Sequence, residues 1–231
     1  SGLGKHLFEI FNSIPYNRQV SGDEYNKLKK EGVDIIIHAA FNSSKNIGSN
    51  NLYSYFEDNV VLTEKLIKIP HKKFIFISSV DVYPKDGKTH TEDEIIDVSK
   101  INNLYSIMKL ISESLVKKRC ANFLILRCTS LIGKYSRKNS LLKIIEEDNP
   151  ILTLSPNSTC NYILHTDVSG FIKLAIEKNL KGVYNLASSK NITLAEVAQL
   201  LKKTVNFGDY MYNVGNIDNT KASAIYPAVK R

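Results

Sequence analysis

Tyr105 and Lys109 lie four residues apart in a segment with helical periodicity, so both side chains are expected on one helix face, about one turn apart. A cation beside a phenol favours the phenolate and lowers the phenol pKa from about 10 toward the working pH. A tyrosine in that position can exchange a proton with a substrate hydroxyl or carbonyl group. The same spacing also occurs in helices without catalytic function, so the pattern needs a second feature to support it.

The second feature is a hydroxyl group at the end of a buried strand. The apolar run 74-FIFIS-78 leads directly into Ser79. In open α/β sheets, ligands bind beyond the carboxyl ends of the strands, where Ser79 could hydrogen-bond a reacting oxygen. The sequence therefore predicts a catalytic centre of Ser79, Tyr105 and Lys109.

Strands and helices alternate along the chain. Four short runs rich in Val, Ile and Phe lack polar alternation, which is typical of parallel strands buried on both faces: 33-VDIIIH-38, 74-FIFIS-78, 123-FLILR-127 and 183-VYNLA-187. Amphipathic helical stretches are expected between and around them, at 5–11, 24–31, 55–67, 103–118, 167–178 and 194–205. This order predicts an α/β fold with a doubly wound parallel sheet.

Composition excludes several classes of protein. The 231 residues are 43% apolar, and no apolar run reaches the roughly 20 residues that span a bilayer. Three cysteines without metal-ligand spacing predict neither a disulfide framework nor a metal site, and they favour the reducing cytoplasm. The net charge of +8 favours anionic partners, but no nucleic-acid motif accompanies it.

The arrangement of these motifs resembles the extended short-chain dehydrogenase/reductases of the NAD-dependent epimerase/dehydratase family. The Ser-Ser-x-x-Val-Tyr strand end at 78–83 and the Tyr-x-x-x-Lys helix carry the resemblance, with Ser79 and Tyr105 26 residues apart. Further matches follow in the family's order: His38-Ala39-Ala40, 58-DNVVLTEKLI-67, 126-LRCTSLIG-133, 162-YILHTDV-168 and 183-VYNLASSKNITLAEVAQLL-201. The resemblance implies a Rossmann-type domain with a small substrate-binding lobe.

By this resemblance Tyr105 is the acid/base, Lys109 binds the nicotinamide ribose and lowers the Tyr pKa, and Ser79 polarises the substrate oxygen. The expected cofactor contacts are Gly2 and Gly4 on the pyrophosphate, Asp23 near the adenine, and Ala39, Ala40 and Asn59 along the cofactor. Gly22-Asp23 also reads as a plain helix start. The cofactor is NAD or NADP, with NAD slightly preferred, and Arg18 is either a 2′-phosphate ligand or a surface arginine.

The resemblance also divides the chain. Residues 1–132 and 162–190 are expected to form the dinucleotide-binding domain, and residues 133–161 and 191–231 the substrate-binding lobe. The segment Ser1 to Gly4 reads as the second half of a glycine-rich turn that enters a helix. A strand that supplies the first glycine is therefore expected before Ser1.

The expected function is an NAD(P)-dependent nucleotide-sugar epimerase with a possible homodimeric state. A keto-sugar reductase of the same family and a catalytically silent dinucleotide-binding regulator are the alternatives.

Cys160 stands where the family commonly has a substrate-phosphate arginine, and the cluster Lys134, Arg137 and Lys138 is a candidate replacement or a solvated loop. Ser130 and Leu164 replace the family's asparagine and histidine, and His165 is read as structural. Val80 and Asp81 replace the adjacent Asp and Glu of the 4,6-dehydratases, so dehydration is not expected.

Overall fold

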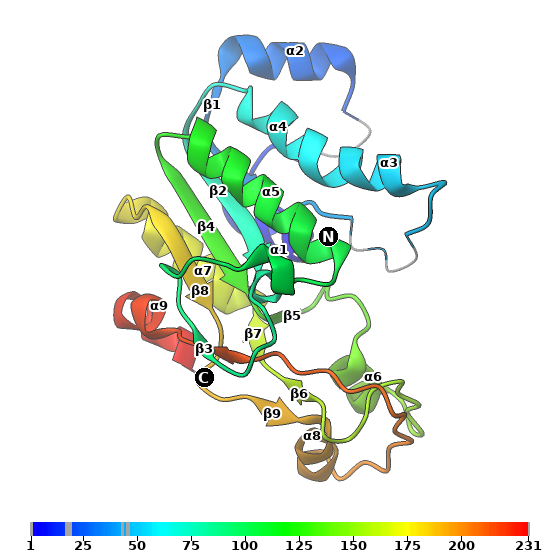
Figure 1. The fold of residues 1–231 in the computed structure, drawn as a ribbon. Helices are drawn as coiled ribbons and strands as arrows, with labels where there is room; N and C mark the ends of the chain where they lie inside the picture. Colours follow the sequence, from blue (N-terminus) through cyan, green and yellow to red (C-terminus); the bar gives the residue numbers. More distant parts are fainter. Residues whose placement is uncertain (1, 17–19, 43, 45–46, 231) are drawn as a thin grey trace.

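A four-stranded parallel sheet forms the centre of the computed structural model, which describes residues 2–16, 20–42, 44 and 47–230. The strands follow the order β1 (Val33–His38), β2 (His71–Ser79), β4 (Phe123–Cys128) and β8 (Gly182–Leu186) (Figure 1). All three neighbouring pairs are parallel. The predicted parallel α/β sheet is therefore confirmed, strand by strand.

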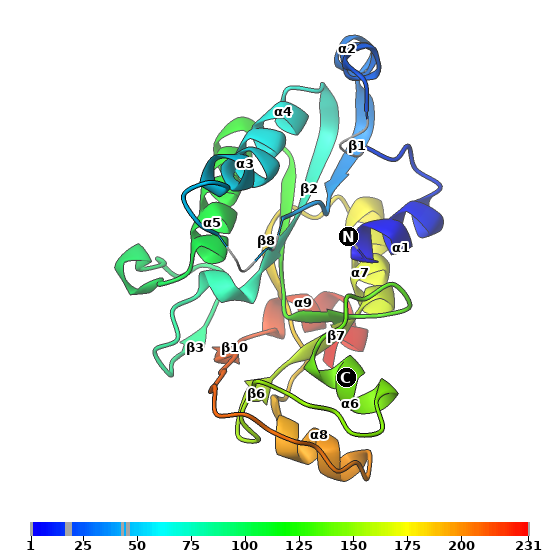
Figure 2. The same cartoon turned by 90° about the vertical axis from the view of Figure 1, so that its right-hand side faces the viewer.

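Helices cover both faces of this sheet (Figure 2). One face carries α3 (Leu52–Phe56), the π-helical turn η1 (Glu57–Val61), α4 (Leu62–Ile67) and α5 (Leu104–Arg119). The other carries α1 (Gly2–Phe11) and α7 (His165–Glu177), and α9 (Thr220–Ile225) packs beside β8. The remaining helices and helical turns are α2 (Gly22–Glu31), η2 (Val80–Val82), η3 (Val98–Lys100), α6 (Ser140–Glu146), α8 (Leu194–Leu200) and η4 (Pro227–Lys230).

The central strands are buried on both faces, which explains their unbroken apolar runs. In β2, Phe74 and Phe76 pack with α4 and α5, and Ile75 and Ile77 pack with α1 and α7. Successive strand residues point to opposite faces, so a strand with helices on both sides needs an apolar residue at every position.

A second packed unit lies below the carboxyl edge of the sheet (Figures 1 and 2). Its buried residues are Ile144 of α6, Leu152, Cys160 of β6 (Thr159–Cys160), and Leu194 and Val197 of α8. The strand β9 (Ile192–Thr193) pairs with β6 and adds the partly buried Ile192. Two further short pairs join β5 (Ser130–Ile132) with β7 (Tyr162–Leu164), and β3 (Thr89–His90) with β10 (Asn216–Ile217). The division into two domains stays a prediction. Both α9 and Val229 were expected in the substrate-binding lobe, but they pack against the core around the central sheet.

Three expected elements differ from the structure. The helix expected at 55–67 is α3, η1 and α4 in succession, because one turn adopts π-helical bonding. The helix expected at 194–205 ends at Leu200, and Lys202 takes a positive φ of 52°. The helix expected at 24–31 begins at Gly22, behind a capping box formed by Ser21 and Glu24, which agrees with Gly22-Asp23 as a plain helix start.

Among the described residues, no helix combines the length and the apolar character needed to cross a membrane.

Candidate active site

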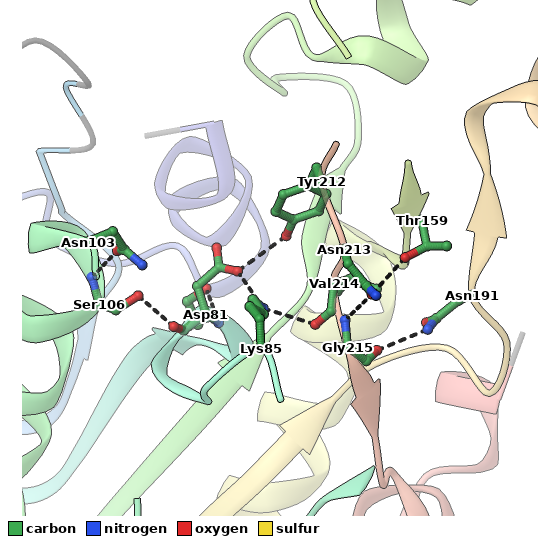
Figure 3. A network of polar contacts seen from close by, with 11 residues as sticks. Asp81, Lys85, Asn103, Ser106, Thr159, Asn191, Tyr212, Asn213, Val214 and Gly215 are labelled. Atoms are coloured by element: carbon green, nitrogen blue, oxygen red, sulfur yellow. Dashed lines mark hydrogen bonds and ion pairs between the residues drawn. The ribbon is translucent and has the colours of Figure 1, made fainter. Parts of the chain in front are cut away.

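Ser79 and Tyr105 face one cavity at the carboxyl edge of the sheet. β2 ends at Ser79, and α5 begins one residue before Tyr105, behind the N-cap Asn103. The Asn103 side chain accepts a hydrogen bond from the Ser106 backbone (2.8 Å), and the Ser106 hydroxyl donates to the backbone oxygen of Asp81 (Figure 3). The first turn of α5 is thereby fixed to the end of β2, which brings the phenol and the hydroxyl together.

The cavity measures about 220 Å³. Besides Ser79 and Tyr105, its walls come from β2, the segment that follows β4, and the C-terminal part of the chain: Ser78, Asp81, Thr129, Ser130, Leu131 and Tyr212. Hydroxyl groups dominate this lining, which suits a polyhydroxylated ligand.

The electrostatics of Tyr105 differ from the sequence expectation. Burial raises the pKa of Tyr105 well above 10, the charge of Asp81 raises it further, and a hydrogen bond with Ser79 opposes the rise. The expected lowering by Lys109 is not found in this state, because burial lowers the pKa of Lys109 to about 7, so its positive charge is lost before the phenol titrates. Tyr105 is therefore a proton donor unless a further positive charge comes near.

Lys109 lies one turn after Tyr105 and is buried, with 4% of its surface exposed. Its Nζ donates to the Ile77 backbone oxygen at 2.7 Å and stands 3.9 Å from the centre of the Phe41 ring. Burial lowers the pKa of Lys109 to about 7, against a smaller opposing effect of nearby acidic groups. An ammonium has three donors, and one protein oxygen accepts from it in the described part of the chain, so ribose hydroxyl groups fit here once the Phe41 ring moves.

Asn59 lies in η1 and holds the segment after β1. Its side-chain oxygen accepts from the Asn42 backbone (2.7 Å), and its side-chain nitrogen donates to the Asn42 carbonyl (3.1 Å). Ala39 and Ala40, between β1 and Asn42, are small residues at the carboxyl edge of the sheet. These three residues lie at the edge where the resemblance places the cofactor, and their cofactor contacts stay a prediction.

His38, at the end of β1, adds a buried polar group beside Lys109. Its Nε2 lies 2.9 Å from the Thr63 hydroxyl, and its Nδ1 has no hydrogen-bond partner among the described residues. Burial, and then the charge of Lys109, lower the pKa of His38 to about 3. The ring is thus neutral at physiological pH, and Lys109, whose own pKa is about 7, carries a positive charge only in part at that pH.

The other expected cofactor residues lie apart from this cavity lining. Gly2 begins α1, and a Cβ there would overlap the Tyr135 carbonyl, so close packing against that backbone requires glycine. Gly4 lies inside the same helix, and Asp23 is exposed in the first turn of α2. Arg18 lies outside the described residues. The roles of these residues toward a cofactor stay predictions.

Tyr212 and Lys85 are site residues that the sequence analysis missed. The Tyr212 phenol donates to Oδ1 of Asp81 at 3.2 Å, and Lys85 Nζ bonds to the same oxygen at 3.1 Å and to the Val214 carbonyl at 2.9 Å (Figure 3). Burial, reinforced by Asp81, raises the pKa of Tyr212 well above 10. Tyr212 lies 131 residues after Asp81, in an irregular segment with a second tyrosine two residues before it, so no local signal could have identified it.

A buried ion pair between Arg127 and Glu113 lies next to the end of β2, where Ser78 contacts it. The Glu113 carboxylate accepts from Arg127 Nη2 at 2.7 Å and from Nε at 3.0 Å, and it also accepts from the Ser78 hydroxyl at 2.6 Å. Arg127 also donates to the Tyr83 phenol oxygen at 2.8 Å. Because Ser78 precedes Ser79, this network joins α5 and β4 to the strand end that presents the Ser79 hydroxyl.

The segments flanking the expected substrate-phosphate site make internal contacts. Asn161, next to Cys160, is buried and bonds to the backbone of Ser188 and Lys190. In the basic cluster, Lys138 pairs with Glu147, and Lys134 lies over the Tyr135 ring at 5.0 Å. The role of this cluster as a phosphate clamp stays a prediction.

His165 is 2% exposed at the start of α7, beside Gly133. Burial, and then the charge of His6, lower the pKa of His165 to about 4. This environment suits the structural reading, and Leu164, which replaces the family's histidine, is partly exposed beside it.

A family model described as the NAD dependent epimerase/dehydratase family matches residues 20–187. This match covers more than half of the chain and includes Ser79, Tyr105 and Lys109. The chain belongs to this family. It is accordingly an enzyme of the extended short-chain dehydrogenase/reductase type, with NAD or NADP as cofactor.

Solved structures share the fold of this family member. UDP-glucuronic acid 4-epimerase from Bacillus cereus, in complex with UDP-glucuronic acid and NAD, is 19% identical over 97% of this chain and 80% of its own, with a TM-score of 0.74. dTDP-4-dehydrorhamnose reductase from Yersinia enterocolitica is 21% identical over 97% and 89%, with a TM-score of 0.76. MoeE5, in complex with UDP-glucuronic acid and NAD, is 17% identical over 98% and 90%, with a TM-score of 0.77. A search of curated proteins finds no match.

Proposed function

We propose that this protein is an NAD(P)-dependent nucleotide-sugar epimerase in which Tyr105 is the acid/base. The observation that carries the proposal is that the Tyr105 phenol and the Ser79 hydroxyl line one cavity at the carboxyl edge of the sheet, with Lys109 one helical turn behind Tyr105. Family membership and the nucleotide sugars bound by structural relatives support it. Of the two cofactors, NAD is slightly preferred.

The chain's own groups divide the proton chemistry. Ser79 Oγ accepts a hydrogen bond from the Asp81 backbone (3.1 Å), so its own hydrogen can be donated either to Tyr105 or to the reacting sugar oxygen. Tyr105 removes the proton from that hydroxyl as the sugar carbon is oxidised, and returns it when the carbon is reduced on the other face. Lys109 would hold the nicotinamide ribose through its remaining donors.

Because burial and Asp81 raise the Tyr105 pKa, the proton removal requires a new positive charge near the phenol. A bound oxidised nicotinamide supplies such a charge and also the hydride acceptor. Lys109, one turn away, contributes in the same direction when it is protonated, which its pKa of about 7 allows near and below neutral pH. The phenol therefore acts as a base only in the loaded enzyme.

The test is a screen of UDP-, dTDP- and GDP-hexoses with the purified protein and either cofactor. We expect a product of inverted configuration at one carbon without net change in nicotinamide absorbance. Net consumption of reduced nicotinamide would identify a keto-sugar reductase in place of an epimerase. Tyr105→Phe should abolish product formation, whereas Tyr53→Phe, at a tyrosine 73% exposed, is the matched control.

A homodimeric state and a cytoplasmic location stay predictions.

A further inference from the structure

The reaction cavity contains a carboxylate whose contacts leave one oxygen for a ligand. Asp81 lines the cavity between Tyr105 and Tyr212, and its side chain is 32% exposed. Within the described part of the chain, the hydrogen bonds to this carboxylate from Tyr212 and Lys85 both fall on Oδ1 (Figure 3). Oδ2 can therefore accept a hydrogen bond from a ligand.

Asp81 also sets the charge of the cavity. Among the described residues that line it, Asp81 is the one ordinarily charged at neutral pH, and the others are hydroxyl-bearing, thiol or aliphatic. Lys85 is not part of this lining, and its Nζ donates to Asp81 Oδ1 and to the Val214 carbonyl oxygen. The same Asp81 charge raises the pKa of both neighbouring phenols, so a negative field acts at the place where a substrate sits.

The dimensions of the cavity bring a substrate close to that charge. Its volume of about 220 Å³ lies below the range of about 300–1,000 Å³ that is usual for drug-sized ligands, so it holds one sugar ring and not a whole nucleotide sugar. A ring whose reacting oxygen bonds to Tyr105 and Ser79 then has its other substituents near Asp81, two residues after Ser79.

We propose that Asp81 is a specificity-determining residue that accepts a hydrogen bond from a hydroxyl or amino group of the sugar ring and excludes sugars that carry a carboxylate. The inference rests on the proposed function and specifies its substrate class as neutral or amino hexoses, in contrast to uronic acids. Two carboxylates in one small cavity repel each other and each loses hydration, so a uronate binds less well than the matching hexose. Tyr212 and Lys85 are positioning residues, because they act by fixing Oδ1.

The experiment compares UDP-glucose with UDP-glucuronic acid as substrates of the full chain, loaded with cofactor. We expect kcat/KM for UDP-glucose to exceed that for UDP-glucuronic acid by about 10-fold or more. Asp81→Asn keeps the shape of the side chain and removes its charge, so the ratio of the two constants should fall toward one. Asp34→Asn removes the same charge in β1, where Asp34 forms an exposed ion pair with Lys72 of β2, and it should leave the ratio unchanged.

Tyr212→Phe provides a second variant in case Asp81→Asn does not fold. It removes a hydrogen bond to Asp81 and retains the charge, so the preference for UDP-glucose should persist even if turnover falls. A ratio that favours UDP-glucuronic acid in the wild type, or one that Asp81→Asn leaves unchanged, would overturn the inference while the proposed function stands. Turnover of neither compound, nor of any sugar in the screen, would refute the proposed function and the inference with it.

Discussion

Replacement of Lys109 by methionine should change how stability depends on pH. The Lys109 ammonium is 4% exposed, and burial lowers its pKa from 10.5 to about 7 in the folded chain. Between these two pKa values the unfolded chain binds a proton that the folded chain does not. The free energy of unfolding of the wild type therefore rises with pH across this window, and the Lys109 contribution is least favourable below pH 7.

The magnitude follows from the two pKa values. Each pH unit inside the window is worth about 1.4 kcal/mol, so the wild type should gain about 2.5 kcal/mol relative to Lys109→Met between pH 7.5 and 9.5. Burial raises the pKa of Cys120 and Cys128 to about 11 and 12, which lowers stability above about pH 8.5. Both thiols remain in the variant, so the Cys120 effect cancels in the difference, and the Cys128 effect cancels apart from its coupling to the Lys109 charge.

The assay is urea unfolding followed by far-ultraviolet circular dichroism, since the chain has no tryptophan. It is repeated at several pH values from 6.5 to 9.5 for the wild type, Lys109→Met and the control Lys118→Met, whose lysine is exposed on the same helix. A difference between wild type and Lys109→Met that stays constant with pH would refute the reasoning, because Lys109 would then keep an ordinary pKa despite its burial.

Three further predictions concern chemistry and the support of the site. Tyr105→Phe should lower turnover by about 100-fold or more while the thermal midpoint stays near that of the wild type, and a variant with near-normal turnover would remove Tyr105 from the mechanism. Mass spectrometry of products from dTDP-, GDP- and UDP-hexoses should show no loss of water, because Val80 cannot exchange a proton; efficient dehydration that survives Asp81→Asn would contradict this. Glu113→Gln should lower the free energy of unfolding by about 3–5 kcal/mol in urea titrations, because it leaves the Arg127 charge buried without its partner, and a loss below 1 kcal/mol would show that the pair is dispensable.

The sequence alone determined the layers of the fold and named the candidates for the centre of the site. Strands buried on both faces must be apolar at every position, so four such runs separated by amphipathic segments leave little choice besides a parallel sheet covered by helices. The spacing of Tyr105 and Lys109 places both on one helix face for purely geometric reasons. Ser79 follows from the rule that ligands bind at the carboxyl edge.

Tertiary structure decided what lies far apart in sequence and what depends on burial. Tyr212 reaches Asp81 across 131 residues, and no local periodicity encodes that contact. The start of α2 at Gly22 depends on the Ser21 cap, and the sequence left this helix start as one of two interpretations of Gly22-Asp23, beside a contact near the adenine. The Tyr105 pKa is raised, whereas its spacing from Lys109 indicated a lowered value, and the Lys109 pKa is lowered. Spacing describes how near two groups are, but desolvation by the surrounding core decides which of them stays charged.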